Sequence, residues 1–413
     1  MEGRCLEGGA WKAVLGRGCL RKGVLGRGCL EGGAWKGVLA RSQGPNIGLL
    51  HLVQQGCFAE VVGGEAAETI FDELFTSRNP EKVLDGFAWT EGPAFIHEPE
   101  NDESSRLIFT DTIEDRIYEY TPIEKELQLY MEGGGGCPDM ERVWRAEPGA
   151  NGIAMKRTST VPTVIFCQHG ARQISMLDLA TRQIRPLASR FNGTRFNSPN
   201  DLVLDEDEKF VYFTDPIYGL LEKARFYDGA YVDLKSELGF SGLFRARVTD
   251  GDAHVELLDQ SLKRPNGIAF TPDFSALVVS ECCQGEEIPG CVQGDARWHV
   301  YRKDASGNFV TRSKTIDIDD VGPGLGCADG MKFHPSGWLI ASCPQGICII
   351  DIDKGTLLAR LDMASRVSNI AVEPFSAEKP HLYMTGEGHL WRLPLRKPKR
   401  DAIGHVARGH TEL

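Results

Sequence analysis

The chain has 413 residues, a length that fits either two ordinary domains or one large all-β domain with an extension. Its 58 acidic residues outnumber its 46 basic residues, so the formal charge is −12. So acidic a surface repels phosphate, and we therefore expect no nucleic-acid partner. No apolar run reaches the length of about 18 residues that a membrane-spanning helix needs, so we expect no membrane partner either.

The first part of the chain is a glycine-rich repeat in which residues 5–12 (CLEGGAWK) recur as residues 29–36. It has neither a helical nor a strand period, and glycine this dense cannot easily offset its ordering entropy. We therefore predict that residues 1–60 form a low-complexity, poorly ordered extension. Residues 61–84 form a lead-in segment, in which an amphipathic stretch at 66–75 predicts a helix.

The twelve cysteines bear on the compartment, because disulfides persist only where the surroundings are oxidising. None forms a CxxC pair, and Cys167 and Cys343 lie inside apolar strand-like runs, where thiols usually serve as small hydrophobic side chains. The N-terminus also lacks the apolar core of a signal peptide. We expect a cytoplasmic protein, and the sequon at Asn192 supports the alternative of a secreted one.

A second repeat, diverged in sequence but regular in pattern, begins near residue 85. Six times a polar residue precedes a short apolar strand, and each start is followed by a second apolar run and an alternating third one. Six units of three or four antiparallel strands predict an all-β fold, a six-bladed β-propeller over residues 85–393, with residues 394–413 as a tail. We expect N- and C-terminal segments to pair in one blade, which removes free sheet edges. The six polar starts are Glu91, Asn151, Asn200, Asn266, Asp329 and Asn369.

These six residues should surround one opening of the central channel, because each begins the innermost strand of its blade. Two carboxylates and several amide oxygens form a hard site that suits Ca²⁺ better than a thiophilic metal, with Zn²⁺, Mn²⁺ or Mg²⁺ as alternatives. The competing interpretation is that Asn151, Asn266 and Asp329, each followed by glycine, form tight hairpin turns. Glu91 has no such turn preference, and its place in the first repeat favours the metal.

Four motifs carry a resemblance to a known family. They are TEGP at 90–93, NSPND at 197–201 with YFTDP at 212–216, RPNG at 264–267 and ADGM at 328–331. Over about residues 85–393 the chain resembles the gluconolactonase family, which includes regucalcin and the fungal lactonohydrolases. The resemblance implies a six-bladed propeller with one catalytic divalent cation at the mouth of its channel. It implies that Glu91, Asn266 and Asp329 are metal ligands and that Asn200 is a ligand or a substrate contact.

One position departs from the family pattern. The animal members carry an arginine two positions before Asn200, where this chain has Ser198. Arg195 from the same loop is a candidate replacement, although an arginine in a loop is more often a solvated charge. We predict that Asn151, Asn200 and Arg195 contact the substrate.

The resemblance and the residues together predict a metal-dependent hydrolase that opens a small lactone, such as that of a sugar acid. A cation polarises the carbonyl, and a nearby carboxylate activates the attacking water. Asp329 is our candidate base, and Glu91 remains a ligand. His169, after the second strand of the second unit, is a candidate acid, base or substrate contact, against the alternative of a structural histidine.

Three other acids near the mouth are assigned supporting roles. Asp111 and Asp215 end equivalent strands and are expected to accept hydrogen bonds that stabilise their blades, and Asp201 is expected to support the site from behind. Two other functions remain open, a propeller like strictosidine synthase and a binding propeller without chemistry. The metal content of the purified protein distinguishes the lactonase from both of these, because only the lactonase requires a tightly held cation.

Overall fold

The computed structural model describes residues 60–96, 106–222, 236–249, 254–282, 296–304, 306–309, 311–318 and 326–398, and four short strands before residue 20. The chain divides into two units, Met1–Phe58 and Ala59–Leu413. In the first unit β1 (Cys5–Glu7) pairs with β2 (Ala10–Lys12), and β3 (Val14–Leu15) pairs with β4 (Gly18–Cys19). The rest of residues 1–59 lies outside the described residues, so their predicted poor order stays a prediction.

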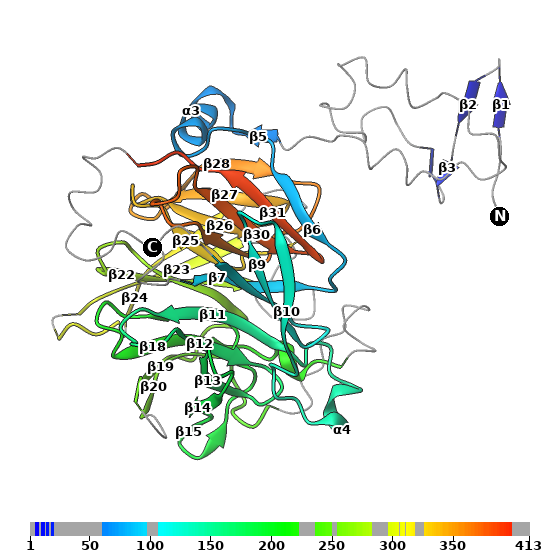
Figure 1. The fold of residues 1–413 in the computed structure, drawn as a ribbon. Helices are drawn as coiled ribbons and strands as arrows, with labels where there is room; N and C mark the ends of the chain where they lie inside the picture. The colour runs from blue at the N-terminus through cyan, green and yellow to red at the C-terminus, as the bar shows by residue number, and fades with distance from the viewer. Residues whose placement is uncertain are drawn as a thin grey trace. The chain divides into compact units, whose positions relative to one another are not determined.

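In the described part of the second unit, six antiparallel sheets of four or five strands form the six predicted blades (Figure 1). From the channel outwards, the first three comprise β7 (Thr90–Ile96), β8 (Arg106–Asp111), β9 (Arg116–Thr121) and β10 (Glu126–Glu132); β11 (Ala150–Lys156), β12 (Thr163–Gln168), β13 (Gln173–Asp178) and β14 (Ile184–Ala188); and β17 (Leu202–Leu204), β18 (Phe210–Asp215), β19 (Gly242–Arg247) and β20 (Val255–Asp259). The other three comprise β21 (Pro265–Phe270), β22 (Ala276–Cys282), β23 (Ala296–Arg302) and β24 (Thr311–Ile318); β25 (Met331–Phe333), β26 (Leu339–Cys343), β27 (Gly346–Asp351) and β28 (Thr356–Asp362); and β29 (Asn369–Val372), β30 (His381–Gly386) and β31 (His389–Pro394).

The innermost strands form a closed ring in which each contacts the next, from β7 through β11, β17, β21 and β25 to β29 and back to β7. The predicted six-bladed propeller is confirmed. The second strand of a blade lies between neighbouring blades, so both its faces are buried and its sequence reads as a continuous apolar run. Strands β12 and β22 are buried along their whole length for this reason. Between the second and third blades, for example, Phe196, Phe213 and Phe244 share one hydrophobic cluster.

The ring is closed by strands from the start of the second unit. Strand β6 (Glu81–Asp85) pairs with β31 as the outermost strand of the sixth blade, which confirms the predicted pairing of N- and C-terminal segments. Strand β5 (Glu60–Val62) adds a fifth strand to β28 of the fifth blade. Both strands lie in or beside the segment predicted as a lead-in, so that segment contributes directly to two blades.

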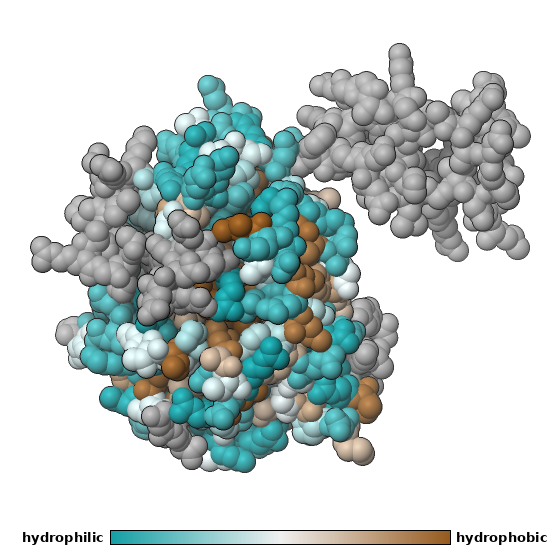
Figure 2. All heavy atoms as spheres, viewed as in Figure 1, coloured by the Kyte–Doolittle hydropathy of each residue, from teal (hydrophilic) through white to brown (hydrophobic). Residues whose placement is uncertain are grey.

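Helix α3 (Gly64–Leu74) confirms the helix predicted in the lead-in segment. Ala67, Phe71 and Leu74 recur at helical spacing and are buried in a cluster with residues of the fifth and sixth blades. The opposite side of the helix carries exposed acidic residues, and Figure 2 shows hydrophilic side chains outermost in the region of α3. The helix therefore covers apolar surface where the two blades meet. In the described part of the chain, no helix is long and apolar enough to span a bilayer.

Two disulfides correct one interpretation of the cysteines. Cys343, which the sequence indicated was an unpaired apolar thiol, is bonded to Cys348, and Cys282 is bonded to Cys327. The cause of the first is local: β26 and β27 form a tight hairpin in which Cys343 lies opposite Gly346, so Cys348 falls within reach on the facing strand. Cys167 is free and buried, as predicted.

Deleting residues 1–55 should leave folding and activity nearly unchanged, with a melting temperature within about 2 °C of that of the full chain. Every helix and strand of the second unit begins at or after Glu60, so the deletion removes none of them. Thermal unfolding and lactone turnover check the prediction. A deletion of residues 1–79 is the control: it removes α3 and its buried Phe71, and it should cost more than the ~3 kcal/mol of one buried phenylalanine.

Candidate metal and active site at the channel mouth

The six residues that begin the repeats, which we call the mouth ring, are buried at one end of the central channel. Amide hydrogen bonds connect three of them across adjacent blades: Asn151 Nδ2 donates to Asn200 Oδ1 at 2.9 Å, and Asn200 Nδ2 donates to Asn266 Oδ1 at 2.5 Å. Asn369 Nδ2 donates to Asp201 Oδ2 at 3.4 Å. The structure therefore brings the predicted residues together at the mouth.

The starts of three innermost strands contain β-bulges, which explains the polar residue followed by glycine. The register shifts between Glu91 and Ala94, between Ala150 and Ile153, and between Pro265 and Ile268. A bulge re-aims a side chain at the end of a strand. The hairpin-turn interpretation is wrong for Asn151 and Asn266, because both lie within strands.

The glycines at these starts are required by close contact between blades. A Cβ atom on Gly92, which has a φ of 50°, would lie 2.1 Å from the carbonyl oxygen of Asn151 in the next blade. A Cβ atom on Gly267 would lie 2.2 Å from the carbonyl oxygen of Asp329. Only glycine allows the backbones to approach this closely, and the approach narrows the mouth around the polar side chains.

Hydroxyl groups near the ends of the second strands donate hydrogen bonds to the backbone carbonyls of three mouth residues. Thr110 Oγ1 donates to the carbonyl of Asn151 at 3.3 Å, and Thr214 Oγ1 donates to that of Asn266 at 2.6 Å. Ser280 Oγ donates to the carbonyl of Asp329 at 2.8 Å. In each case a residue of one blade positions a mouth residue of the next blade, so the site is built by neighbouring blades together.

Glu91 and Asp329 are the two buried carboxylates of the mouth ring. Burial raises the pKa of both, and each also feels the negative charges of Asp201 and Glu147. The charge of Glu91 further raises the pKa of Asp329. Like charges held close together in a buried site are costly unless a cation or a proton compensates them.

Unsatisfied oxygens at the mouth support a cation in this place. Asp329 Oδ1 and Asn151 Oδ1 are buried and have no hydrogen-bond partner, although buried polar atoms nearly always have one. The described residues contain no group of three or more His, Cys, Asp or Glu side chains arranged to hold a metal, so a cation here needs amide oxygens as well as the two carboxylates. Such an oxygen set is typical of Ca²⁺.

The supporting acids lie as the sequence predicted. Asp111 accepts hydrogen bonds from the backbone N–H groups of Ala88, Trp89 and Glu114, and Asp215 accepts from those of Asn197 and Ser198. Both therefore fix loops at the mouth end of their blades. Burial raises the pKa of Asp215 to about 7.

Asp201 lies one residue after Asn200, and its carboxylate accepts from the backbone N–H of Leu202 at 2.9 Å. It is buried beside the ring and adds negative charge to it. It therefore supports the site from behind, as predicted.

His169 and Glu147 form a buried pair at the mouth. His169 Nδ1 lies 3.4 Å from Glu147 Oε2, and neither ring nitrogen of the fully buried histidine has a well-formed hydrogen bond. Burial lowers the pKa of His169 to about 3, so its ring is neutral at pH 7. Burial raises the pKa of Glu147 to about 7.

Glu147 is a site residue that was not predicted from the sequence. It lies in the connection between β10 and β11, four residues before Asn151. The signal was its position in EPGAN, directly before a mouth residue, but a glutamate in a long loop is usually solvated. Its burial was not readable from the sequence.

The side chain of Arg145 holds the connection between β10 and β11 in place. It is 2% exposed, and its Nη1 donates to the carbonyls of His169 at 3.1 Å and Gly219 at 2.7 Å. Its Nε donates at 3.0 Å to Oε2 of Glu141, a residue of helix α4 (Asp139–Arg142). Arg145 thus joins three loops, the last of which contains the 3₁₀ turn η2 (Tyr218–Leu220).

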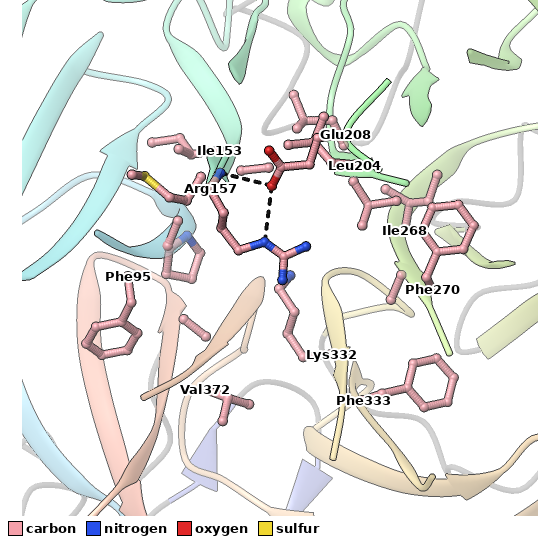
Figure 3. A pocket seen from close by; sticks show the side chains of 18 of the residues that line it. Phe95, Ile153, Arg157, Leu204, Glu208, Ile268, Phe270, Lys332, Phe333 and Val372 are labelled. Atoms are coloured by element: carbon pink, nitrogen blue, oxygen red, sulfur yellow. Dashed lines mark hydrogen bonds and ion pairs between the residues drawn. The ribbon is translucent and has the colours of Figure 1, made fainter. Parts of the chain in front are cut away.

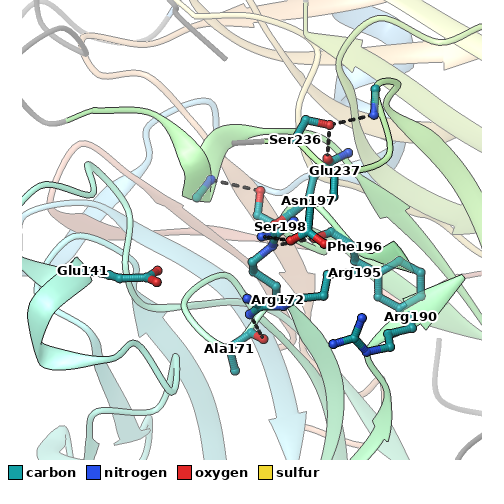
Figure 4. A network of polar contacts seen from close by, with 12 residues as sticks. Glu141, Ala171, Arg172, Arg190, Arg195, Phe196, Asn197, Ser198, Ser236 and Glu237 are labelled. Atoms are coloured by element: carbon teal, nitrogen blue, oxygen red, sulfur yellow. Dashed lines mark hydrogen bonds and ion pairs between the residues drawn. The ribbon is translucent and has the colours of Figure 1, made fainter. Parts of the chain in front are cut away.

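Arg195 lies in a different group of residues. It belongs to the short hairpin of β15 (Arg190–Phe191) and β16 (Thr194–Arg195), and its Nη2 donates to the carbonyl of Ala171 at 3.4 Å (Figure 4). Beside it Arg172 pairs with Glu237 at 2.8 Å. Among the described contacts, none joins Arg195 to a residue of the ring, so its predicted substrate contact stays a prediction.

Ser198, at the position that departs from the family pattern, has a structural role. Its hydroxyl donates to the carbonyl of Pro216 at 2.7 Å and accepts from the N–H of Gly219 at 3.0 Å. The buried Ser198 therefore fixes the turn η2 to the loop before β17.

Comparison with known proteins identifies the family. The model of the SMP-30/gluconolactonase/LRE-like region matches residues 89–387, and the chain belongs to this family. It is 30% identical over 278 residues to a gluconolactonase of Zymomonas mobilis, covering 66% of this chain and 69% of that protein. It is 24% identical over 235 residues to the lactonohydrolase oryL of Aspergillus oryzae, covering 52% of this chain and 48% of that protein.

Solved structures show the same fold. A gluconolactonase of Xanthomonas campestris superimposes with a TM-score of 0.61 at 24% identity, covering 82% of this chain and 95% of that one. A calcium-binding protein described as regucalcin, from Agrobacterium tumefaciens, has a TM-score of 0.52 at 14% identity and covers 79% and 95% of the two chains. At these identities the likeness concerns the fold alone.

Proposed function

We propose that this protein is a metal-dependent lactonase whose active site is the mouth ring. The observation that carries the proposal is the pair of buried acids, Glu91 and Asp329, which share the mouth with an unpartnered amide oxygen of Asn151. Membership of the gluconolactonase family supports the reaction, and the relatives are named as gluconolactonase and lactonohydrolase. The name of the calcium-binding relative supports Ca²⁺ as the cation.

Glu91, Asn200, Asn266 and Asp329 would hold the cation. When bound, the cation supplies electrophilic activation of the lactone carbonyl and stabilises negative charge on its oxygen. The amides of Asn151 and Asn200 orient the substrate by hydrogen bonds. Asp329 accepts the proton of the attacking water, and the ring then opens to a hydroxy acid.

For His169 we propose a narrower role than that of acid or base. With a pKa of about 3 the imidazole is a weak base, and its ring nitrogens lack well-formed hydrogen bonds. We assign His169 to contact a hydroxyl or carbonyl of the substrate. Its neighbour Glu147 is the better alternative to Asp329 as the base, because its pKa of about 7 lies near the working pH.

Substituting Glu147 tests whether Glu147 or Asp329 is the base. A carboxylate base acts only when deprotonated, so if Glu147 is the base, activity rises with pH through about 7 and this limb disappears in Glu147→Gln. Because Asp329 is our assignment, we expect Glu147→Gln to lower kcat by no more than about tenfold and to leave the pH dependence of the rate as it is in the unsubstituted enzyme. Measuring kcat/KM against pH checks this, with Glu126→Gln, an exposed glutamate of β10, as the control.

The direct test is a panel of lactones, including aldonolactones, pantoyl lactone and aryl esters, assayed with and without a chelator. We expect hydrolysis of at least one lactone, loss of activity on chelation, and recovery when Ca²⁺ is added. Turnover that persists after all metal has been removed would contradict the metal-dependent reaction. Tight binding of Ca²⁺ without hydrolysis of any lactone would instead favour a binding propeller.

A further inference from the structure

The other end of the central channel contains a separate cavity. Its volume is about 220 Å³, and residues from the middle and far ends of the innermost strands line it. Phe95, Ile153, Phe270 and Phe333 are among its apolar residues (Figure 3). Since the innermost strands begin at the mouth, these residues lie further along the channel than the ring, and none of the predicted site residues lines this cavity.

Three charged residues line this cavity, and two of them, Arg157 and Glu208, pair with each other. Glu208, from the turn between β17 and β18, accepts from Arg157 Nε at 3.1 Å and from the backbone N–H groups of Arg157 and Thr158. That carboxylate is therefore fully occupied in holding two turns together. The remaining charged residue of the lining is Lys332, whose side chain points into the cavity (Figure 3).

Lys332 has no carboxylate within ion-pair distance among the residues that the structure describes. Its ammonium donates to the backbone carbonyl of Met331 at 3.1 Å and feels the more distant charge of Asp201. An ammonium group in an apolar cavity is more stable with an anionic partner close by. The cavity thus combines apolar walls with one cation available for a ligand.

We propose that this cavity binds a small amphipathic carboxylate, with its anionic group on Lys332 and its apolar part against the phenylalanines. A water occupies about 30 Å³ of liquid, so a cavity of about 220 Å³ has room for roughly seven groups of that size. A short-chain fatty acid matches this volume and both chemical features. The site is distinct from the lactone site and does not depend on the proposed reaction.

Calorimetric titration of the full chain with hexanoate, 1-hexanol and hexylamine tests the proposal. We expect hexanoate to bind about tenfold more tightly than the alcohol, and the amine to bind most weakly, because only the carboxylate pairs with Lys332. Lys332→Met and Lys332→Gln should remove the preference for hexanoate. Lys209→Met, which removes an exposed lysine from the turn that also carries Glu208, should retain it.

Every titration is repeated in EDTA and in Glu91→Gln, because a carboxylate also binds calcium. Hexanoate binding that survives both conditions supports the far cavity. Binding that disappears in either one places the carboxylate on the mouth cation and overturns the proposal, as does equal binding of all three compounds or unchanged selectivity in both folded Lys332 variants. The lactone assay of the same samples reports separately on the proposed reaction.

Discussion

Asp329→Asn should turn over its lactone about 10²–10⁴-fold more slowly than the unsubstituted enzyme, even when Ca²⁺ is saturating. Asparagine retains an oxygen that can contact the cation but cannot accept the proton of the attacking water. Asp329 lies buried at the mouth, and its Oδ1 has no hydrogen-bond partner there. The measurement is kcat over a calcium series that reaches a plateau.

The matched control is Asp111→Asn, another buried aspartate at the mouth end of a blade. Its carboxylate accepts only from backbone N–H groups, so the substitution should lower the melting temperature and leave kcat close to normal while the protein is folded. If saturating calcium restores most of the rate of Asp329→Asn, Asp329 is a ligand alone, and Glu147 becomes the base.

Glu91→Gln should weaken calcium binding by about 10²-fold, because it removes one of the two ring carboxylates while preserving its shape. Removing one charge of a buried pair typically costs about 2–5 kcal/mol. At a calcium concentration a hundredfold above Kd, binding stabilises the folded protein by about 2.7 kcal/mol, and a hundredfold weaker site leaves about 0.4 kcal/mol. The calcium-dependent rise in melting temperature should therefore nearly vanish.

Glu119→Gln provides the control, since Glu119 is equally buried but pairs with Arg106 at 2.8 Å on β8, away from the mouth. This variant should have a lower melting temperature than the unsubstituted protein at every calcium concentration. Its melting temperature should still rise by the full amount when calcium is added. Calcium affinity by calorimetry that is the same in Glu91→Gln and in the unsubstituted protein would remove Glu91 from the ligand set.

Much of the ring could be predicted because it depends on a local pattern. The innermost strands are short and apolar, each begins with a polar residue, and a propeller gathers the starts of all its innermost strands at one end. Asn151, Asn200, Asn266 and Asp329 follow from that geometry alone. Even the wrong alternative, a hairpin turn, came from the correct observation of glycine, whose cause is the approach of the next blade and not a turn.

The remainder of the site could not be predicted because it depends on how long loops fold. Glu147 lies in a loop that Arg145 joins to two others, and no pattern in the sequence connects these three segments. The pairing of Cys282 with Cys327 is equally non-local, since it links residues 45 positions apart. Lys332 alternates with buried neighbours on β25, but the cavity it faces is made by six strands from distant parts of the chain.

Closure of the ring by β6 has a consequence for biosynthesis. A ribosome makes the N-terminus first, at about 5–20 residues per second, so β6 emerges well before its partner β31, some 300 residues later. During that interval β6 and β5 expose unpaired strand edges, which are prone to pair with other chains. The first five blades can assemble while the chain is being made, whereas the sixth must wait until its own strands, β29 to β31, have been synthesised. Chaperones that keep the nascent chain soluble should therefore raise the yield of folded protein, and they should act mainly in the interval before β31 pairs with β6.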